Sequence, residues 1–66
     1  MDELNDLLEF FQYNNVSIQI TLDVDKYPTV HAIYKKELYK TEHEDVISAL
    51  KAMKKKLIKV ALDNSN

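Results

Sequence analysis

The 66-residue sequence predicts an α+β fold, a single small domain in which a helix, a β-hairpin and a second helix follow in order, with both helices on one face of the sheet. Two observations predict this order. Apolar residues recur at helical spacing near both ends of the chain, and strict alternation of apolar and polar residues lies between them. Because so short a chain does not divide into two cores, we assign residues 1–66 to one domain.

Residues 3–13 are expected to form the first helix. One face of this stretch is apolar and consists of Leu4, Leu7, Leu8 and Phe11, while acidic residues near its start favour the helix dipole. Asn14 and Asn15 follow, and asparagine tolerates the left-handed conformation that often ends a helix. The sequence therefore predicts that the chain turns at these two residues.

Residues 16–24 show the clearest strand pattern in the sequence. Apolar side chains alternate with polar ones, and the apolar set is Val16, Ile18, Ile20, Leu22 and Val24. Such alternation is typical of a strand with one face buried. The only proline, Pro28, closes a polar stretch after this strand, so a reversal is expected there.

A second strand is expected from Thr29, with two alternatives for its end. Either one long strand runs to about Lys40, or the chain bends near residues 35–37 and residues 38–41 add a third strand to the antiparallel sheet. Along an unbroken strand, one face would carry His31, Ile33, Lys35, Glu37 and Tyr39, and the other Val30, Ala32, Tyr34, Lys36 and Leu38.

The second helix is predicted to begin at about Glu42, because Thr41 and Glu44 have the spacing of a capping box. Its apolar face consists of Val46, Ile47, Leu50, Met53, Leu57, Val60 and Ala61, and residues 63–66 are expected to fray. The predicted core combines the three apolar faces and contains Leu7, Phe11, Ile18, Ile20, Leu22, Leu50, Met53 and Leu57.

The composition argues against an enzyme and against a cofactor-binding protein. The chain has no glycine, which phosphate-binding loops, dinucleotide motifs and nucleophile elbows require, and no cysteine for thiolate chemistry or zinc ligation. His43 lies among acidic residues, but that pattern is typical of a helix start rather than of a metal site. We therefore expect no catalytic, cofactor-binding or metal-binding residues and no small-molecule substrate.

The start of the sequence, Met1-Asp2-Glu3, has neither the basic residues nor the long apolar run of a secretion signal or membrane span. A cytoplasmic protein without membrane contacts is therefore expected. All nine basic residues are lysines, and asparagine, isoleucine and tyrosine are frequent, which is typical of AT-rich coding sequences such as those of low-GC bacteria and their phages.

The leading functional hypothesis is a non-catalytic binding protein, for example a phage-encoded regulator or inhibitor, which acts by docking onto another protein or by forming a homodimer. Because both helices are expected on one face of the sheet, the other face should stay open for binding. The candidate partner-binding residues on that face are Ile33, Tyr39, His31, Lys35, Gln19 and Thr21.

The alternative hypothesis is binding of nucleic acid or the ribosome through lysines. Residues 1–25 contain six acidic residues and no lysine, whereas residues 26–62 contain nine lysines and four acidic residues. A basic stripe along a helix can follow a phosphate backbone. The candidate residues are Lys51, Lys54, Lys55, Lys56 and Lys59 in the second helix.

Overall fold

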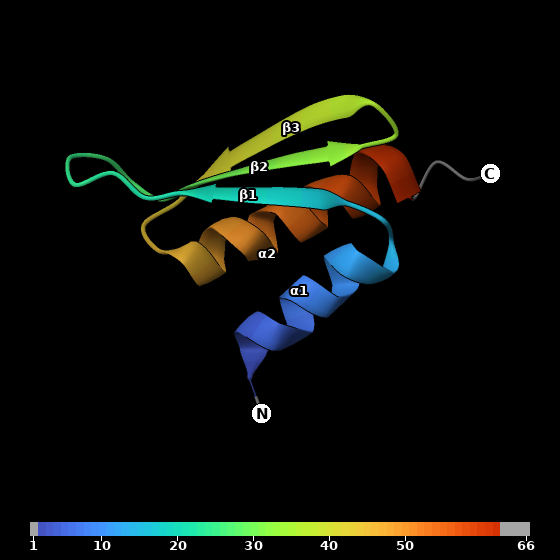
Figure 1. Ribbon diagram of the computed structural model, residues 1–66, viewed down its shortest axis with the longest axis horizontal. Helices are drawn as coiled ribbons and strands as arrows, with labels where there is room; N and C mark the ends of the chain where they lie inside the picture. The colour runs from blue at the N-terminus through green and yellow to red at the C-terminus, as the bar shows by residue number, and fades with distance from the viewer. Residues whose placement is uncertain (1, 63–66) are drawn as a thin grey trace.

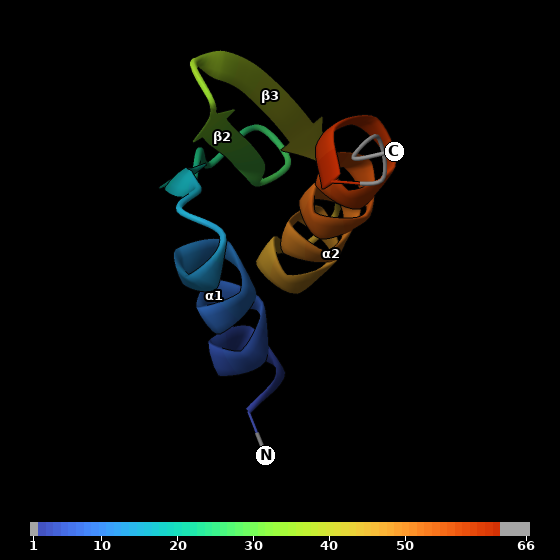
Figure 2. The same ribbon diagram turned by 90° about the vertical axis from the view of Figure 1, so that its right-hand side faces the viewer.

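The computed structural model describes residues 2–62. It consists of α1 (Glu3–Tyr13), β1 (Ser17–Thr21), β2 (Thr29–Tyr34), β3 (Glu37–Glu42), α2 (Val46–Leu57) and the π-helical segment η1 (Ile58–Leu62). The strands form one antiparallel sheet in the order β1-β2-β3 (Figure 1). Both helices lie on the same side of this sheet (Figure 2), which confirms the predicted α+β fold and selects its three-stranded form. The predicted fraying of residues 63–66 lies outside the described residues.

α1 begins and ends as its sequence predicts. The Asp2 carboxylate accepts a hydrogen bond from the Leu4 backbone N–H at 3.1 Å and caps the helix. After the helix, Asn15 has φ 59°, and the Asn14 side-chain amide donates to the Phe10 carbonyl at 2.8 Å. Asparagine therefore makes the turn into β1 that glycine commonly makes in other proteins.

β1 is shorter than predicted, and this corrects the predicted core. The strand ends at Thr21, and the loop that follows projects beyond the helices (Figure 1). Because no helix covers that loop, Leu22 is 70% exposed and Val24 is fully exposed, while Ile20 at the end of the strand is 38% exposed. The prediction that Ile20 and Leu22 are core residues was therefore wrong.

A tight turn at Lys35 and Lys36 joins β2 to β3. Tyr34 pairs with Glu37, and the two residues between them have φ of 51° and 70°. Positive φ at both central residues is typical of the turn whose twist suits a two-residue hairpin. The alternative of one long strand to Lys40 is excluded.

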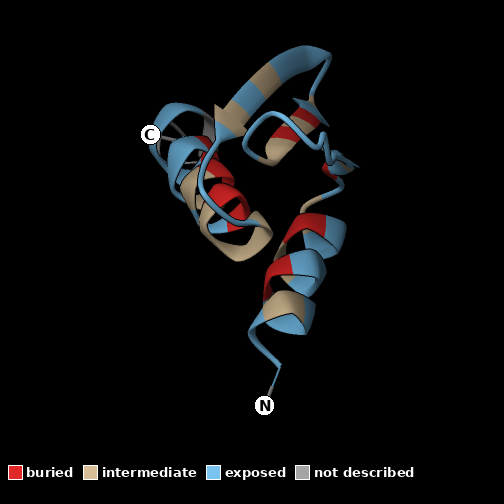
Figure 3. Cartoon of the chain, turned by 90° about the vertical axis from the view of Figure 1, so that its left-hand side faces the viewer, coloured by how far each residue is buried: buried red, intermediate tan, exposed pale blue. Residues whose placement is uncertain are grey.

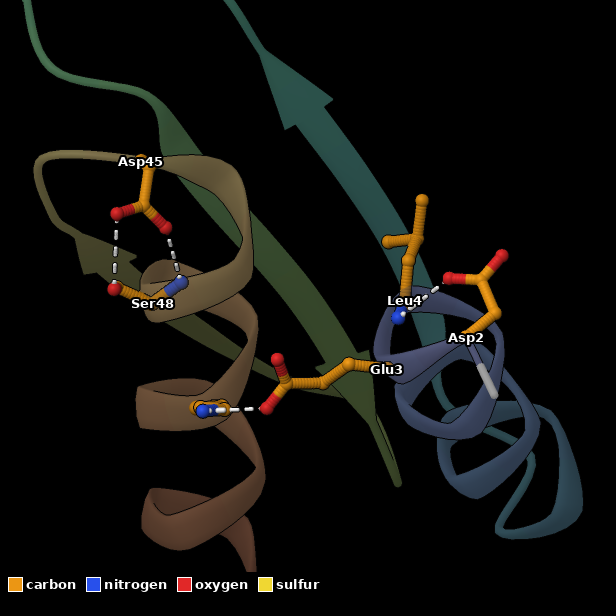
Figure 4. A network of polar contacts seen from close by, with 6 residues as sticks. Asp2, Glu3, Leu4, Asp45 and Ser48 are labelled. Atoms are coloured by element: carbon orange, nitrogen blue, oxygen red, sulfur yellow. Dashed lines mark hydrogen bonds and ion pairs between the residues drawn. The ribbon is translucent and has the colours of Figure 1, made fainter.

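α2 begins later than predicted. Glu42 still pairs with Thr29 in the sheet, and Asp45 caps the helix in place of Thr41. The Asp45 carboxylate accepts hydrogen bonds from the Ser48 backbone N–H at 2.8 Å and from the Ser48 hydroxyl at 3.2 Å (Figure 4). The Thr41 hydroxyl instead donates to the Ala49 carbonyl at 2.8 Å. The predicted capping box was wrong because pairing with β2 holds this segment in the sheet.

The core lies between the sheet and the two helices. Figure 3 shows buried positions on the sides of α1 and α2 that face each other and along β2. The predicted core residues of the helices are confirmed, and β2, which contacts α2, adds Val30 and Ala32 to the core. The buried set is Leu7, Phe11, Val16, Val30, Ala32, Ala49, Leu50, Met53 and Leu57, with the predicted Ile18 partly buried against it.

Candidate functional site

The face of the sheet turned away from the helices is the candidate site, and we call it the open face. The strand register places on it every second residue of each strand. From β1 to β3 these residues are Ser17, Gln19 and Thr21, then Thr29, His31 and Ile33, then Leu38, Lys40 and Glu42.

One end of the open face is apolar. Ile33 pairs with Leu38 of β3 on one side and with Ser17 of β1 on the other. Ile33 is 51% exposed and Leu38 is 66% exposed, so this cross-strand pair presents its side chains to solvent. A hollow of about 440 Å³ lies beside the pair and is lined by Ser17, Ile18, Gln19, Thr21, His31, Ile33 and Leu38.

The other end of the open face is polar. Gln19, His31 and Lys40 form one row across the three strands, and Thr21, Thr29 and Glu42 form the next. A second hollow of about 420 Å³ lies over these rows, where the loop residues Asp23, Lys26 and Tyr27 also border it. His31 and Thr21 line both hollows, so the apolar and polar ends form one continuous surface.

Tyr39 is not on this surface, contrary to the sequence prediction. It pairs with Ala32 and packs, partly buried, against the core on the helix side of the sheet. The reason is the two-residue turn, which pairs Tyr34 with Glu37 and so reverses the odd and even positions between the two faces. The residue that takes the place predicted for Tyr39 is Leu38, which sequence reasoning missed.

Lys35 also lies off the open face, at the end of the sheet. It is in the turn, and its ammonium nitrogen lies 5.4 Å from the centre of the Tyr34 ring. The remaining four predicted partner-binding residues, Ile33, His31, Gln19 and Thr21, do share the open face. The structure thus brings together an apolar end and a polar end on one face, with Leu38 in place of the aromatic residue.

The lysines of the second helix differ in what their side chains contact. Lys51 makes an ion pair with Glu3 of α1 (Figure 4), and the Lys54 ammonium lies 4.9 Å from the centre of the Phe10 ring. Lys56 points toward β3, where it donates to the Lys40 carbonyl at 3.3 Å. Lys55 and Lys59 are exposed, and Lys55 borders a hollow of about 410 Å³ between the helices together with Glu3 and Asp6.

The acidic segment before α2 has a structural role in the cap. Hydrogen bonds from the backbone and side chain of Ser48 lower the pKa of Asp45, and the charges of His43 and Lys51 act in the same direction. The His43 backbone N–H donates to the Pro28 carbonyl at 3.2 Å. Within residues 2–62, no three histidine, aspartate or glutamate side chains are close enough to hold a metal ion.

Two further observations complete the description of the chain. None of the helices described here has the length and apolar character needed to cross a membrane. Comparison with protein-family models, with curated protein sequences and with solved structures finds no match to this chain.

Proposed function

We propose that this protein is a non-catalytic binding protein that docks onto a protein partner through the open face of its sheet. The observation that carries the proposal is the exposed cross-strand pair of Ile33 and Leu38. Two aliphatic side chains on an uncovered sheet face provide apolar area that a partner can bury. Removing apolar surface from water lowers the free energy by about 25 cal/mol per Å², so burial of this pair would favour association with a partner.

The surroundings of this pair support the same proposal. Protein interfaces combine an apolar centre with a polar rim that excludes water, and Gln19, His31 and Lys40 supply donors and acceptors beside the pair. Both hollows on the open face lie on the surface of the sheet and are open to solvent. Such a surface suits a protein better than a small substrate, which enzymes usually enclose in a cleft.

Binding of nucleic acid through α2 is the alternative function. The observation that favours it is that Lys55 of α2 and Lys59 of η1 are exposed and four residues apart, and that neither side chain makes a hydrogen bond, ion pair or ring contact among residues 2–62. The ion pair of Lys51 and the ring contact of Lys54 count against this alternative, because they engage neighbouring lysines within the molecule.

Affinity capture with surface variants tests the proposal. The wild-type protein, Ile33→Asp, Leu38→Asp and Tyr13→Asp are immobilised and exposed to lysate of the native host, and captured proteins are identified by mass spectrometry. Tyr13 is an exposed aromatic residue of α1, so Tyr13→Asp controls for adding a charge at an exposed apolar position elsewhere.

We expect a protein that binds the wild type and Tyr13→Asp but is lost with both open-face variants. Its affinity for the wild type, measured with the purified partner, should fall at least about tenfold with Leu38→Asp, which corresponds to the loss of about 1.4 kcal/mol. Capture that persists with Ile33→Asp and Leu38→Asp would contradict the proposal and direct attention to the helices.

A further inference from the structure

β1 forms an edge of the sheet that lacks the usual protection against pairing with another strand. The strand order β1-β2-β3 leaves one side of β1 without a neighbour, and α1 lies beneath it (Figure 2). Natural edge strands are commonly blocked by charged residues, proline or a bulge. β1 has none of these: Tyr13–Leu22 contains no charged residue or proline, and the register with β2 proceeds one residue at a time.

The sequence of β1 is complementary to itself when read in the opposite direction. Ser17-Ile18-Gln19-Ile20-Thr21 has Gln19 at its centre, one isoleucine on each side and one hydroxyl residue at each end. A two-fold axis at Gln19 would therefore place Ile18 opposite Ile20 of a second copy, and Ser17 opposite Thr21. A symmetric dimer interface needs this self-complementarity.

The backbone geometry is compatible with the same register. In an antiparallel strand, the hydrogen-bonding groups of successive residues point to opposite edges, so either the odd or the even residues face outward. An axis at Gln19 pairs odd residues with odd and even with even. The outward-facing donors and acceptors of one copy therefore meet those of the other.

Exposed apolar residues next to β1 gain neighbours in this register. Ile20, which is 38% exposed on the helix side of the sheet, lies opposite Ile18 of the second copy. One step further, Leu22, which is 70% exposed, lies opposite Val16. Side chains that lie directly opposite each other on neighbouring strands contribute to the stability of a sheet.

We infer that two copies of this chain associate through β1 in an antiparallel manner about Gln19, so that their sheets join into one of six strands. The second copy is favoured over an unrelated strand because the order of side chains in β1 is symmetric and places no charge opposite a like charge. This inference goes beyond the proposed docking function, because it uses the edge of β1 and not the open face.

Oligomeric state and charge-swap variants test the inference. Purified wild-type protein is examined by light scattering and native mass spectrometry over a wide concentration range, together with Gln19→Lys, Gln19→Glu and Leu38→Lys. Gln19 is an exposed residue of the open face, so changing it leaves the core intact, and circular dichroism verifies the fold of each variant. Leu38→Lys adds the same charge to the same face on the opposite edge strand.

We expect a wild-type dimer that is lost in Gln19→Lys and in Gln19→Glu, because each places like charges together at the two-fold axis. Mixing these two variants should restore a dimer that contains one copy of each, and Leu38→Lys should remain dimeric. A wild-type protein that stays monomeric at all concentrations overturns the inference. A dimer that persists in both Gln19 variants also overturns the inference. The same holds for a dimer that is disrupted only by changes on the open face such as Ile33→Asp.

A covalent trap provides a second readout. The chain has no cysteine, so Gln19→Cys introduces a single thiol. Opposite residues in an antiparallel pair have Cα atoms about 4.5–5.5 Å apart, within the range that a disulfide spans. Mild oxidation should cross-link Gln19→Cys rapidly and Lys40→Cys on β3 slowly, and equal rates for the two would contradict pairing through β1.

Discussion

Single residues with positive φ direct the chain where glycine is absent. Asn15 turns the chain from α1 into β1, and Lys35 and Lys36 close the hairpin between β2 and β3. An L-residue other than glycine or asparagine is strained in this region, at a cost of about 1 kcal/mol or more. These two lysines also decide which side chains of β3 reach the open face, so a local conformation sets the composition of the candidate site.

The strain at the turn can be relieved by substitution. Replacing Lys36, at φ 70°, by glycine should increase the free energy of unfolding by about 0.5–1 kcal/mol, because glycine adopts positive φ without a steric penalty. Urea denaturation followed by circular dichroism measures the change. Lys26→Gly in the loop between β1 and β2 is the control, since Lys26 does not have positive φ and its replacement should slightly destabilise the protein. Equal effects of both variants would show that the turn is unstrained.

At the scale of elements, periodicity in the sequence predicted both helices and the first two strands, because the spacing of apolar residues reflects which faces are buried, but it left open whether a third strand follows. The boundaries of these elements could not be predicted, because they depend on which residues of the strands pair with each other. Two capping patterns lie close together, one at Thr41 and Glu44 and one at Asp45 and Ser48, and the ladder between β2 and β3 selects the second. Likewise, alternation continues to Val24, but β1 ends where β2 begins to pair, at Thr21.

The difference between the predicted and observed core leads to a prediction for two leucines. Leu50 is fully buried in α2, so Leu50→Ala should reduce the free energy of unfolding by about 2–5 kcal/mol. Leu22 lies in the exposed loop after β1, so Leu22→Ala should change the stability of the monomer by less than about 0.5 kcal/mol. Thermal denaturation at low protein concentration compares the two. Similar losses of stability in the two variants would show that Leu22 is a core residue.

For the molecule as a whole, the sequence predicted the open face in outline and Ile33, His31, Gln19 and Thr21 as members of it. It could not predict Leu38, because the faces of β3 depend on whether the turn contains an even or an odd number of residues. Separate acidic and basic halves of the chain were also visible in the sequence. The fold brings them into contact, since Lys51 of α2 pairs with Glu3 of α1.

Because Glu3 pairs with Lys51 and so offsets part of the positive charge of α2, we expect weak nucleic-acid binding at most. The double variant Lys55→Glu/Lys59→Glu changes one exposed lysine of α2 and one of η1 and should leave the affinity for a duplex probe at low salt unchanged within about twofold. Fluorescence anisotropy over a salt series provides the measurement. Wild-type binding that weakens steeply with salt, with a slope reduced by about two in the variant, would support the nucleic-acid alternative.

The two edges of the sheet differ in a way that limits how far it can grow. β3 carries Glu37, Lys40 and Glu42, and Lys56 of α2 donates to the Lys40 carbonyl, so that edge is charged and partly occupied. Pairing about Gln19 uses the uncharged edge of both copies and leaves charged edges at both ends. Assembly should therefore terminate at two chains. Replacing the charged residues of β3 with threonine would leave both ends of the dimer's sheet unprotected, so that dimers could join edge to edge into a polymer.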